Sequence, residues 1–127
     1  MLGKIILWIS AIAFISYGLA CLFNPALPAE YAGLGILTGD GYAELGAMYG
    51  GLQTGFGIIC LIGARSDTLR QPMLLVLAIV IGALATGRLY SILTGSGEVG
   101  FYTWGATAYE FVTALIAAIA YRVGADK

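Results

Sequence analysis

Three charged side chains lie within apolar stretches of this sequence or at the start of one: Glu44, Arg88 and Glu110. Charged groups at membrane depth are costly, and they are usually paired and turned toward the protein interior or a wet cavity. Arginine suits such pairing because its planar guanidinium can bind one carboxylate through two N–H groups, or two carboxylates at once. We therefore expect Arg88 to bond to Glu110, to Glu44 or to both.

A cluster of this kind supports several kinds of chemistry. Glu44 and Glu110 are candidate acid and base catalysts, with Arg88 as the electrostatic stabiliser. The same groups could bind the head of an amphipathic ligand, or they could only hold helices in register. A proton pathway is a further alternative, although the segment below Arg88 contains only Thr86 as a side-chain hydrogen bonder.

Two more polar side chains, Tyr49 and Gln53, follow Glu44 along the same apolar segment. At about 100° per residue, Gln53 points almost opposite to Glu44 on a straight α-helix. Only one of these two side chains can therefore line a given narrow pocket. We assign Glu44 to the charge cluster, and Tyr49 or Gln53 to a hydrogen-bonding wall of the bundle.

The composition indicates an integral membrane protein. Hydrophobic residues make up 60% of the 127 residues and charged residues 10%, with a mean hydropathy of +0.92. The basic residues are scattered and the net charge is −1, so nucleic acid is not an expected partner. Histidine is absent, which excludes histidine-ligated metal or haem and a histidine general base. No cofactor motif is present, and we expect neither a metal nor a cofactor.

Four apolar segments have the length that crosses a bilayer, about 20 residues for a hydrocarbon core of about 30 Å. They cover residues 5–23, 44–64, 72–93 and 103–121. Pro72 is expected in the first turn of the third helix, where its missing N–H costs nothing. The prediction is an all-α fold, a single-domain (1–127) four-helix transmembrane bundle. We interpret the first segment as a transmembrane helix that is not cleaved off, because its apolar run is longer than the ~7 to 15 apolar residues of a secretory signal.

The distribution of basic residues predicts the orientation, because short cytoplasmic loops carry an excess of lysine and arginine. One side of the predicted bundle holds Lys4, Arg65, Arg70, Arg122 and Lys127. The connections on the other side hold Glu30, Asp40 and Glu98 and no basic residue. Both termini are therefore predicted to be cytoplasmic. Cys21 and Cys60 then lie at different depths, so we expect buried thiols and no disulfide within the chain.

The connection over residues 24–43 is too long and too apolar for a plain turn. It either lies along the membrane interface or over the bundle as a lid, or it forms an irregular surface loop. The helix that follows carries small residues at every fourth position, which let helix backbones approach closely. The two rows are Gly46, Gly50 and Thr54, and Ala47, Gly51 and Gly55. Their expected partner is the third helix, the fourth helix or another copy, with packing inside the chain favoured.

The stretches "AELGAMYGGLQTGFG" and "ATGRLYSIL", together with the lone Glu110, resemble an uncharacterised family of small bacterial four-helix membrane proteins. This family is a domain of unknown function akin to the DoxX-like group. The residues that match its pattern are Glu44, Met48, Tyr49, Gly50, Gly51, Arg88 and Glu110. Gly46 stands where the family often has an arginine. The resemblance implies the bacterial inner membrane, with relatives among redox-associated membrane subunits and, more distantly, sterol isomerase-type enzymes.

For function, the first hypothesis is a non-catalytic protein that binds a small amphipathic ligand or serves as an accessory subunit of a membrane complex. The alternative is a membrane enzyme, an isomerase or proton-transfer catalyst acting on a lipophilic substrate through Glu44 and Glu110. A second alternative is an oligomeric proton-coupled transporter. The expected partners are the lipid bilayer, a lipophilic or amphipathic molecule, larger membrane subunits and further copies of the chain.

Overall fold

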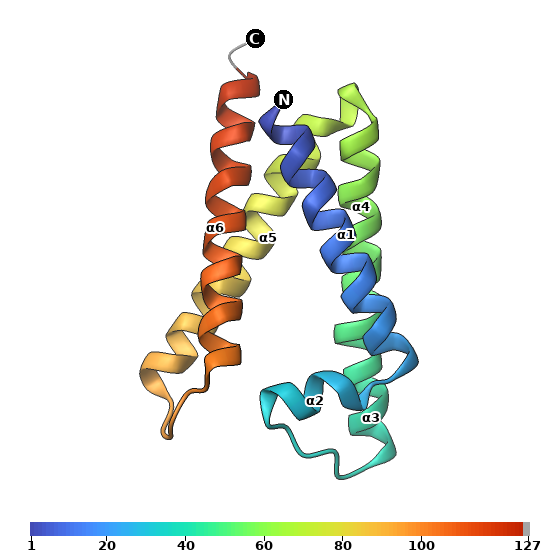
Figure 1. Cartoon of the computed structure of the whole chain (residues 1–127), viewed down its shortest axis with the longest axis vertical. Coiled ribbons are helices and arrows are strands. Elements are labelled where there is room, and N and C mark those ends of the chain that lie inside the picture. The colour runs from blue at the N-terminus through green and yellow to red at the C-terminus, as the bar shows by residue number, and fades with distance from the viewer. Residues whose placement is uncertain (126–127) are drawn as a thin grey trace. The chain divides into compact units, whose positions relative to one another are not determined.

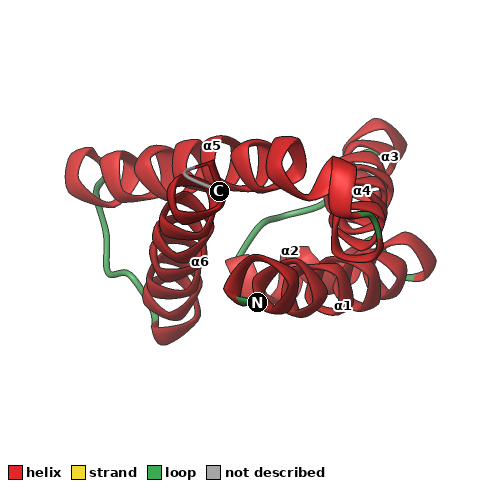
Figure 2. Ribbon diagram, turned by 90° about the horizontal axis from the view of Figure 1, so that it is seen from above, coloured by secondary structure: helices red, strands yellow, loops and turns green. Residues whose placement is uncertain are grey.

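A computed structural model describes residues 1–125, and the regular structure in them is helical (Figures 1 and 2). The elements are α1 (Leu2–Phe23), α2 (Ala26–Ala32), α3 (Gly39–Leu45), the π-helix η1 (Gly46–Leu52), α4 (Gln53–Arg65), α5 (Asp67–Thr94) and α6 (Phe101–Ala125). Four helical stretches are long and apolar enough to cross a membrane: Leu2–Phe23, Gly39–Arg65, Asp67–Thr94 and Phe101–Gly124. The prediction of an all-α chain with four such spans is confirmed.

The third span begins earlier than predicted. It starts at Asp67 rather than at residue 72, because Ser66 caps the helix by accepting a hydrogen bond at its side-chain oxygen from the Leu69 N–H, at 3.3 Å. Pro72 therefore lies inside α5 and not in its first turn, so that prediction was wrong. Only Ser66 separates α5 from α4, which ends at Arg65.

The connection over residues 24–43 is largely helical. Pro25 precedes α2, and Gly33 follows its last residue with a φ of 68°, a left-handed conformation that glycine adopts without strain. A short non-helical segment, 34–38, then leads into α3, which continues through η1 into α4. The alternative of an irregular loop is therefore wrong for most of this connection. Its location along the membrane interface stays a prediction.

The chain divides into two compact units, which are described separately. The α1–α4 unit covers Trp8–Leu61, and the hairpin unit combines Met1–Leu7 with the residues from Ile62 onward. In the α1–α4 unit Gly50 and Thr54 of the first small-residue row pack against α1, whereas Gly46 lies beside Pro25. A Cβ atom built on Gly50 would lie 2.7 Å from the Leu22 Cα, and one built on Gly18 would lie 2.6 Å from the Thr54 backbone nitrogen. The two helix backbones are thus too close for larger side chains at these positions.

Packing of this row inside the chain is confirmed, but the expected partners were wrong. The partner is α1, because α1 offers Gly18 opposite Thr54 and exposes backbone at Leu22 opposite Gly50. Phe14 and Phe56 extend the contact with an edge-to-face ring pair whose centroids are 5.2 Å apart. The second row is exposed and consists of Ala47, Gly51 and Gly55.

In the hairpin unit, α5 and α6 lie side by side and antiparallel, joined by residues 95–100 (Figure 1). The buried face of α5 has the three- and four-residue spacing of a helix stripe: Leu74, Leu77, Ile81 and Ala85. A Cβ atom on Gly82 would lie 3.7 Å from the Ala114 Cβ, an ordinary contact distance, so these two positions face each other across the helices.

The ends of four helices meet in the hairpin unit. Gly3 of α1 lies beside Arg70 and Leu74 of α5 and Ala120 of α6, and Gly63 of α4 lies beside Leu7. Lys4, Arg65, Arg70 and Arg122 consequently occupy one end of this unit, as predicted from the sequence. Lys127 lies outside the described residues. The orientation of this end in a membrane stays a prediction.

Candidate functional site

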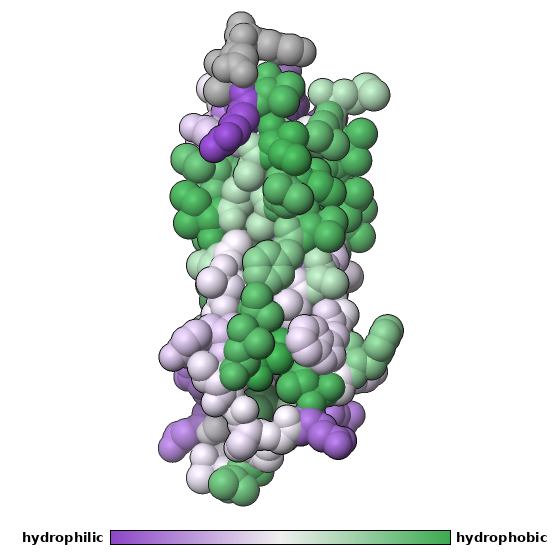
Figure 3. All heavy atoms as spheres, turned by 90° about the vertical axis from the view of Figure 1, so that its left-hand side faces the viewer, coloured by the Kyte–Doolittle hydropathy of each residue, from purple (hydrophilic) through white to green (hydrophobic). Residues whose placement is uncertain are grey.

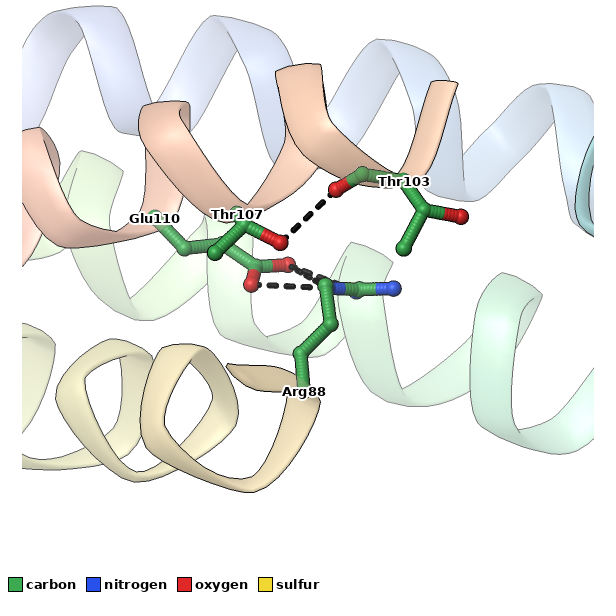
Figure 4. Close-up of polar contacts among 4 residues, drawn as sticks. All are labelled: Arg88, Thr103, Thr107 and Glu110. Carbon is green, nitrogen blue, oxygen red and sulfur yellow. Dashed lines mark hydrogen bonds and ion pairs between the residues drawn. The ribbon is translucent and has the colours of Figure 1, made fainter. Parts of the chain in front are cut away.

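Arg88 and Glu110 form a two-point ion pair between α5 and α6 (Figure 4). The Arg88 Nη2 donates to Glu110 Oε1 at 2.7 Å, and Nε donates to Oε2 at 2.9 Å and to Oε1 at 3.2 Å. Both carboxylate oxygens are therefore bonded to the guanidinium. This is the bidentate geometry that distinguishes arginine from lysine. Of the expected partners Glu110 and Glu44, the pairing with Glu110 is confirmed.

The helix periodicity positions both partners. Arg88 comes three residues after Ala85, so it takes the next place on the buried stripe of α5. Glu110 likewise comes three residues after Thr107, and Thr113 follows at the same spacing; all three are at most 5% exposed. Arg88 lies six residues before Thr94, about 9 Å from the end of α5. The pair thus lies inside the span rather than at its end.

The two partners differ in exposure. The Glu110 side chain is 7% exposed, whereas the Arg88 side chain is 27% exposed. The Glu110 carboxylate is buried between α5 and α6, whereas part of the Arg88 side chain is accessible from outside the hairpin. Any molecule that approaches the pair would therefore contact Arg88 before Glu110.

Hydroxyl groups near the pair bond to their own helices. Thr107 Oγ1 donates to the Thr103 carbonyl at 2.7 Å, and Figure 4 shows both threonines beside the ion pair. On α5, Ser91 donates in the same way to the Gly87 carbonyl at 2.9 Å. These hydroxyls therefore do not compete with Arg88 for Glu110. Figure 3, which shows the left-hand side of Figure 1, has mostly hydrophobic side chains in its upper half and a mixture of pale, hydrophilic and hydrophobic ones in its lower half.

The other predicted site residues belong to the α1–α4 unit. Glu44 is exposed on α3, Tyr49 is half-buried in η1, and Gln53 is half-buried at the start of α4. The structure thus brings together two of the five predicted residues, Arg88 and Glu110, within one unit. A contact of Glu44 with Arg88 stays a prediction.

The helix between Glu44 and Gln53 is not the straight α-helix that we assumed. The π-helix η1 intervenes, and an i→i+5 turn takes one residue more than an α-turn. Each extra residue rotates the following side chains by about 100°. The straight-helix premise behind the opposite directions of Glu44 and Gln53 is therefore wrong. Such π-helical turns often occur at functional sites, and η1 lies within the first stretch that carries the family resemblance.

Both cysteines are free and buried, with 0% exposure for Cys21 and 1% for Cys60. This result agrees with the prediction of buried thiols without a disulfide in the chain. Neither thiol can be reached by a solvent-borne reagent without local opening of the helices.

The fold and the site define a multi-pass helical membrane protein with an arginine–glutamate pair inside one of its helical hairpins. The chain belongs to the family described as "Domain of unknown function (DUF4345)", whose sequence profile matches residues 2–121. This match confirms the predicted resemblance to a domain of unknown function. No curated protein and no solved structure matches the chain.

Proposed function

We propose that this chain is a non-catalytic membrane protein that binds a small amphipathic molecule at the Arg88–Glu110 pair. The observation that carries the proposal is the asymmetry of the pair. Glu110 is buried with both oxygens bonded, whereas 27% of the Arg88 side chain is exposed. A ligand head with hydrogen-bond acceptors would meet Arg88, while its apolar part lies among the lipid-facing side chains of the hairpin.

The same geometry disfavours the enzyme alternative. A general acid or base needs a carboxylate oxygen within hydrogen-bond reach of the substrate proton. The guanidinium occupies both oxygens of Glu110, so proton transfer would first require the ion pair to open. Glu110 is therefore assigned the role of holding and orienting Arg88.

Service as an accessory subunit is the second candidate function, and the exposed row of Ala47, Gly51 and Gly55 favours it. A Cβ atom built on Gly51 or Gly55 would meet nothing within 4 Å. In lipid, such open small-residue faces allow the backbone of another helix to approach closely. A helix from a larger complex or from a second copy fits this face.

We also propose that the chain forms a four-helix bundle in a bacterial inner membrane, with both termini cytoplasmic. We further propose that it is related to the DoxX-like group. The gathering of Lys4, Arg65, Arg70 and Arg122 at one end of the hairpin unit supports this orientation.

Native mass spectrometry of the protein extracted gently from its own membrane tests the function. We expect a retained small molecule that is lost from Glu110→Gln, because a displaced Arg88 no longer presents the same binding geometry. Glu98→Gln, an exposed carboxylate in the loop after α5, is the matched control and should retain the molecule. Retention only of larger protein subunits would support the accessory role instead. A bare chain with neither ligand nor partner would overturn both candidates.

A further inference from the structure

The end of the hairpin unit where four helix ends meet carries a concentrated positive charge. Lys4 is near the start of α1, Arg65 is the last residue of α4, Arg70 is in the first turns of α5, and Arg122 is in the last turn of α6. Lys4, Arg65 and Arg122 are exposed. Among the described residues at this end, Asp67 is acidic, and its Oδ1 pairs with the Arg70 Nη2 at 2.6 Å.

Arg70 is the central member of this basic cluster. Its side chain lies against α1: a Cβ atom built on Gly3 would lie 3.7 Å from the Arg70 Cδ, an ordinary contact distance. Its Nη2 reaches Asp67, but its Nε is buried and has no hydrogen-bond partner. A buried N–H group of a guanidinium without an acceptor is costly, so an acceptor that met this group would be stabilising. The Nε itself is covered, but the side chain as a whole is 26% exposed, so a ligand can reach other parts of it.

We propose that this basic cluster, Lys4, Arg65, Arg70 and Arg122, binds the phosphate of an anionic phospholipid. The phosphate has several acceptor oxygens that match the arginine fork. It could accept from Arg70 and from the neighbouring cationic groups at the same end of the unit.

The lengths of the helices place this cluster at headgroup level. α5 has 28 residues, about 42 Å at 1.5 Å per residue, which exceeds a hydrocarbon core of about 30 Å. Its first turns, with Arg70, therefore extend toward the headgroups. Basic groups between transmembrane helices at this level are a recognised setting for anionic lipid heads. A lipid supplies the phosphate there together with acyl chains for the apolar helix surfaces.

Native mass spectrometry of the delipidated full chain in detergent tests the proposal by titration with phosphatidylglycerol and, separately, with zwitterionic phosphatidylcholine. We expect tighter binding of phosphatidylglycerol. Arg70→Gln and Arg122→Gln should each weaken it about fivefold and leave phosphatidylcholine unaffected. Arg122 is exposed, so its variant tests the site even if Arg70→Gln fails to fold.

Two charge-matched variants separate a local site from bulk charge. Asp67→Asn frees Arg70 from its carboxylate and should strengthen phosphatidylglycerol binding. Glu98→Gln makes the same change in net charge at the other end of the hairpin and should have no effect. Equal effects of the two variants, or equal binding of both lipids by the wild type, would overturn the proposal.

Inorganic phosphate and Glu110→Gln complete the test. Displacement of phosphatidylglycerol by millimolar inorganic phosphate would show that the site takes a soluble anion, and would overturn the lipid assignment. Glu110→Gln should bind phosphatidylglycerol like the wild type, because the Arg88–Glu110 pair lies away from this end of the hairpin. The basic cluster and the proposed ligand site at Arg88 can therefore fail independently.

Discussion

Replacement of Arg88 by leucine tests whether the ion pair holds the hairpin together. The variant leaves Glu110, whose side chain is 7% exposed, without its bonding partner. Breaking a buried pair from one side costs about 3–5 kcal/mol. We expect a loss near the lower end, about 3 kcal/mol, since 27% of the Arg88 side chain is exposed and unfolded helices in lipid also find polar partners.

The free energy of unfolding in mixed micelles, followed by circular dichroism across a denaturing-detergent titration, measures this loss. About 3 kcal/mol corresponds to a change of roughly a hundredfold in the unfolding equilibrium. Glu110→Gln should cost less, about 1–2 kcal/mol, because the amide oxygen still accepts one hydrogen bond from the guanidinium.

Two control variants test whether the loss of stability comes from the ion pair. Thr86→Leu changes an exposed position two residues earlier on α5 and should stay within about 0.5 kcal/mol of the wild type. The double variant Arg88→Leu/Glu110→Leu removes both charges and should recover most of the stability lost in Arg88→Leu. If Arg88→Leu costs no more than Thr86→Leu, the buried-pair reasoning is refuted.

Three further predictions concern the packing, the cap and the orientation. Gly50→Leu should destabilise the α1–α4 unit by about 1–3 kcal/mol because its side chain meets the Leu22 backbone, whereas Gly51→Ala should be nearly neutral, as chemical denaturation would show. Ser66→Ala should cost about 1 kcal/mol in the same assay through loss of the helix cap. The orientation can be tested in a variant whose native cysteines have been replaced. A membrane-impermeant maleimide should label Glu98→Cys in intact cells, and Ser66→Cys only after permeabilisation. The reverse labelling would contradict cytoplasmic termini.

The sequence by itself determined the helical class, the four spans and the need of Arg88 for a carboxylate partner, either Glu110 or Glu44. Apolar runs of membrane-spanning length leave helices as the natural way to satisfy the backbone, and a lone arginine at membrane depth requires a carboxylate. These conclusions follow from composition and from the cost of unpaired charge. They do not depend on how one helix packs against another.

Other features were decided by tertiary structure. The row with Gly46 and Gly50 signals close packing, but its partner depended on which neighbour offered matching backbone, and α1 does so at Gly18 and Leu22. The π-helix η1 changes the direction of Gln53 relative to Glu44, although hydrophobic periodicity assumes a regular 3.6-residue turn. The unequal exposure of the two charged partners likewise arises from the packing of α5 on α6, because residue type and spacing say nothing of how far each side chain is covered.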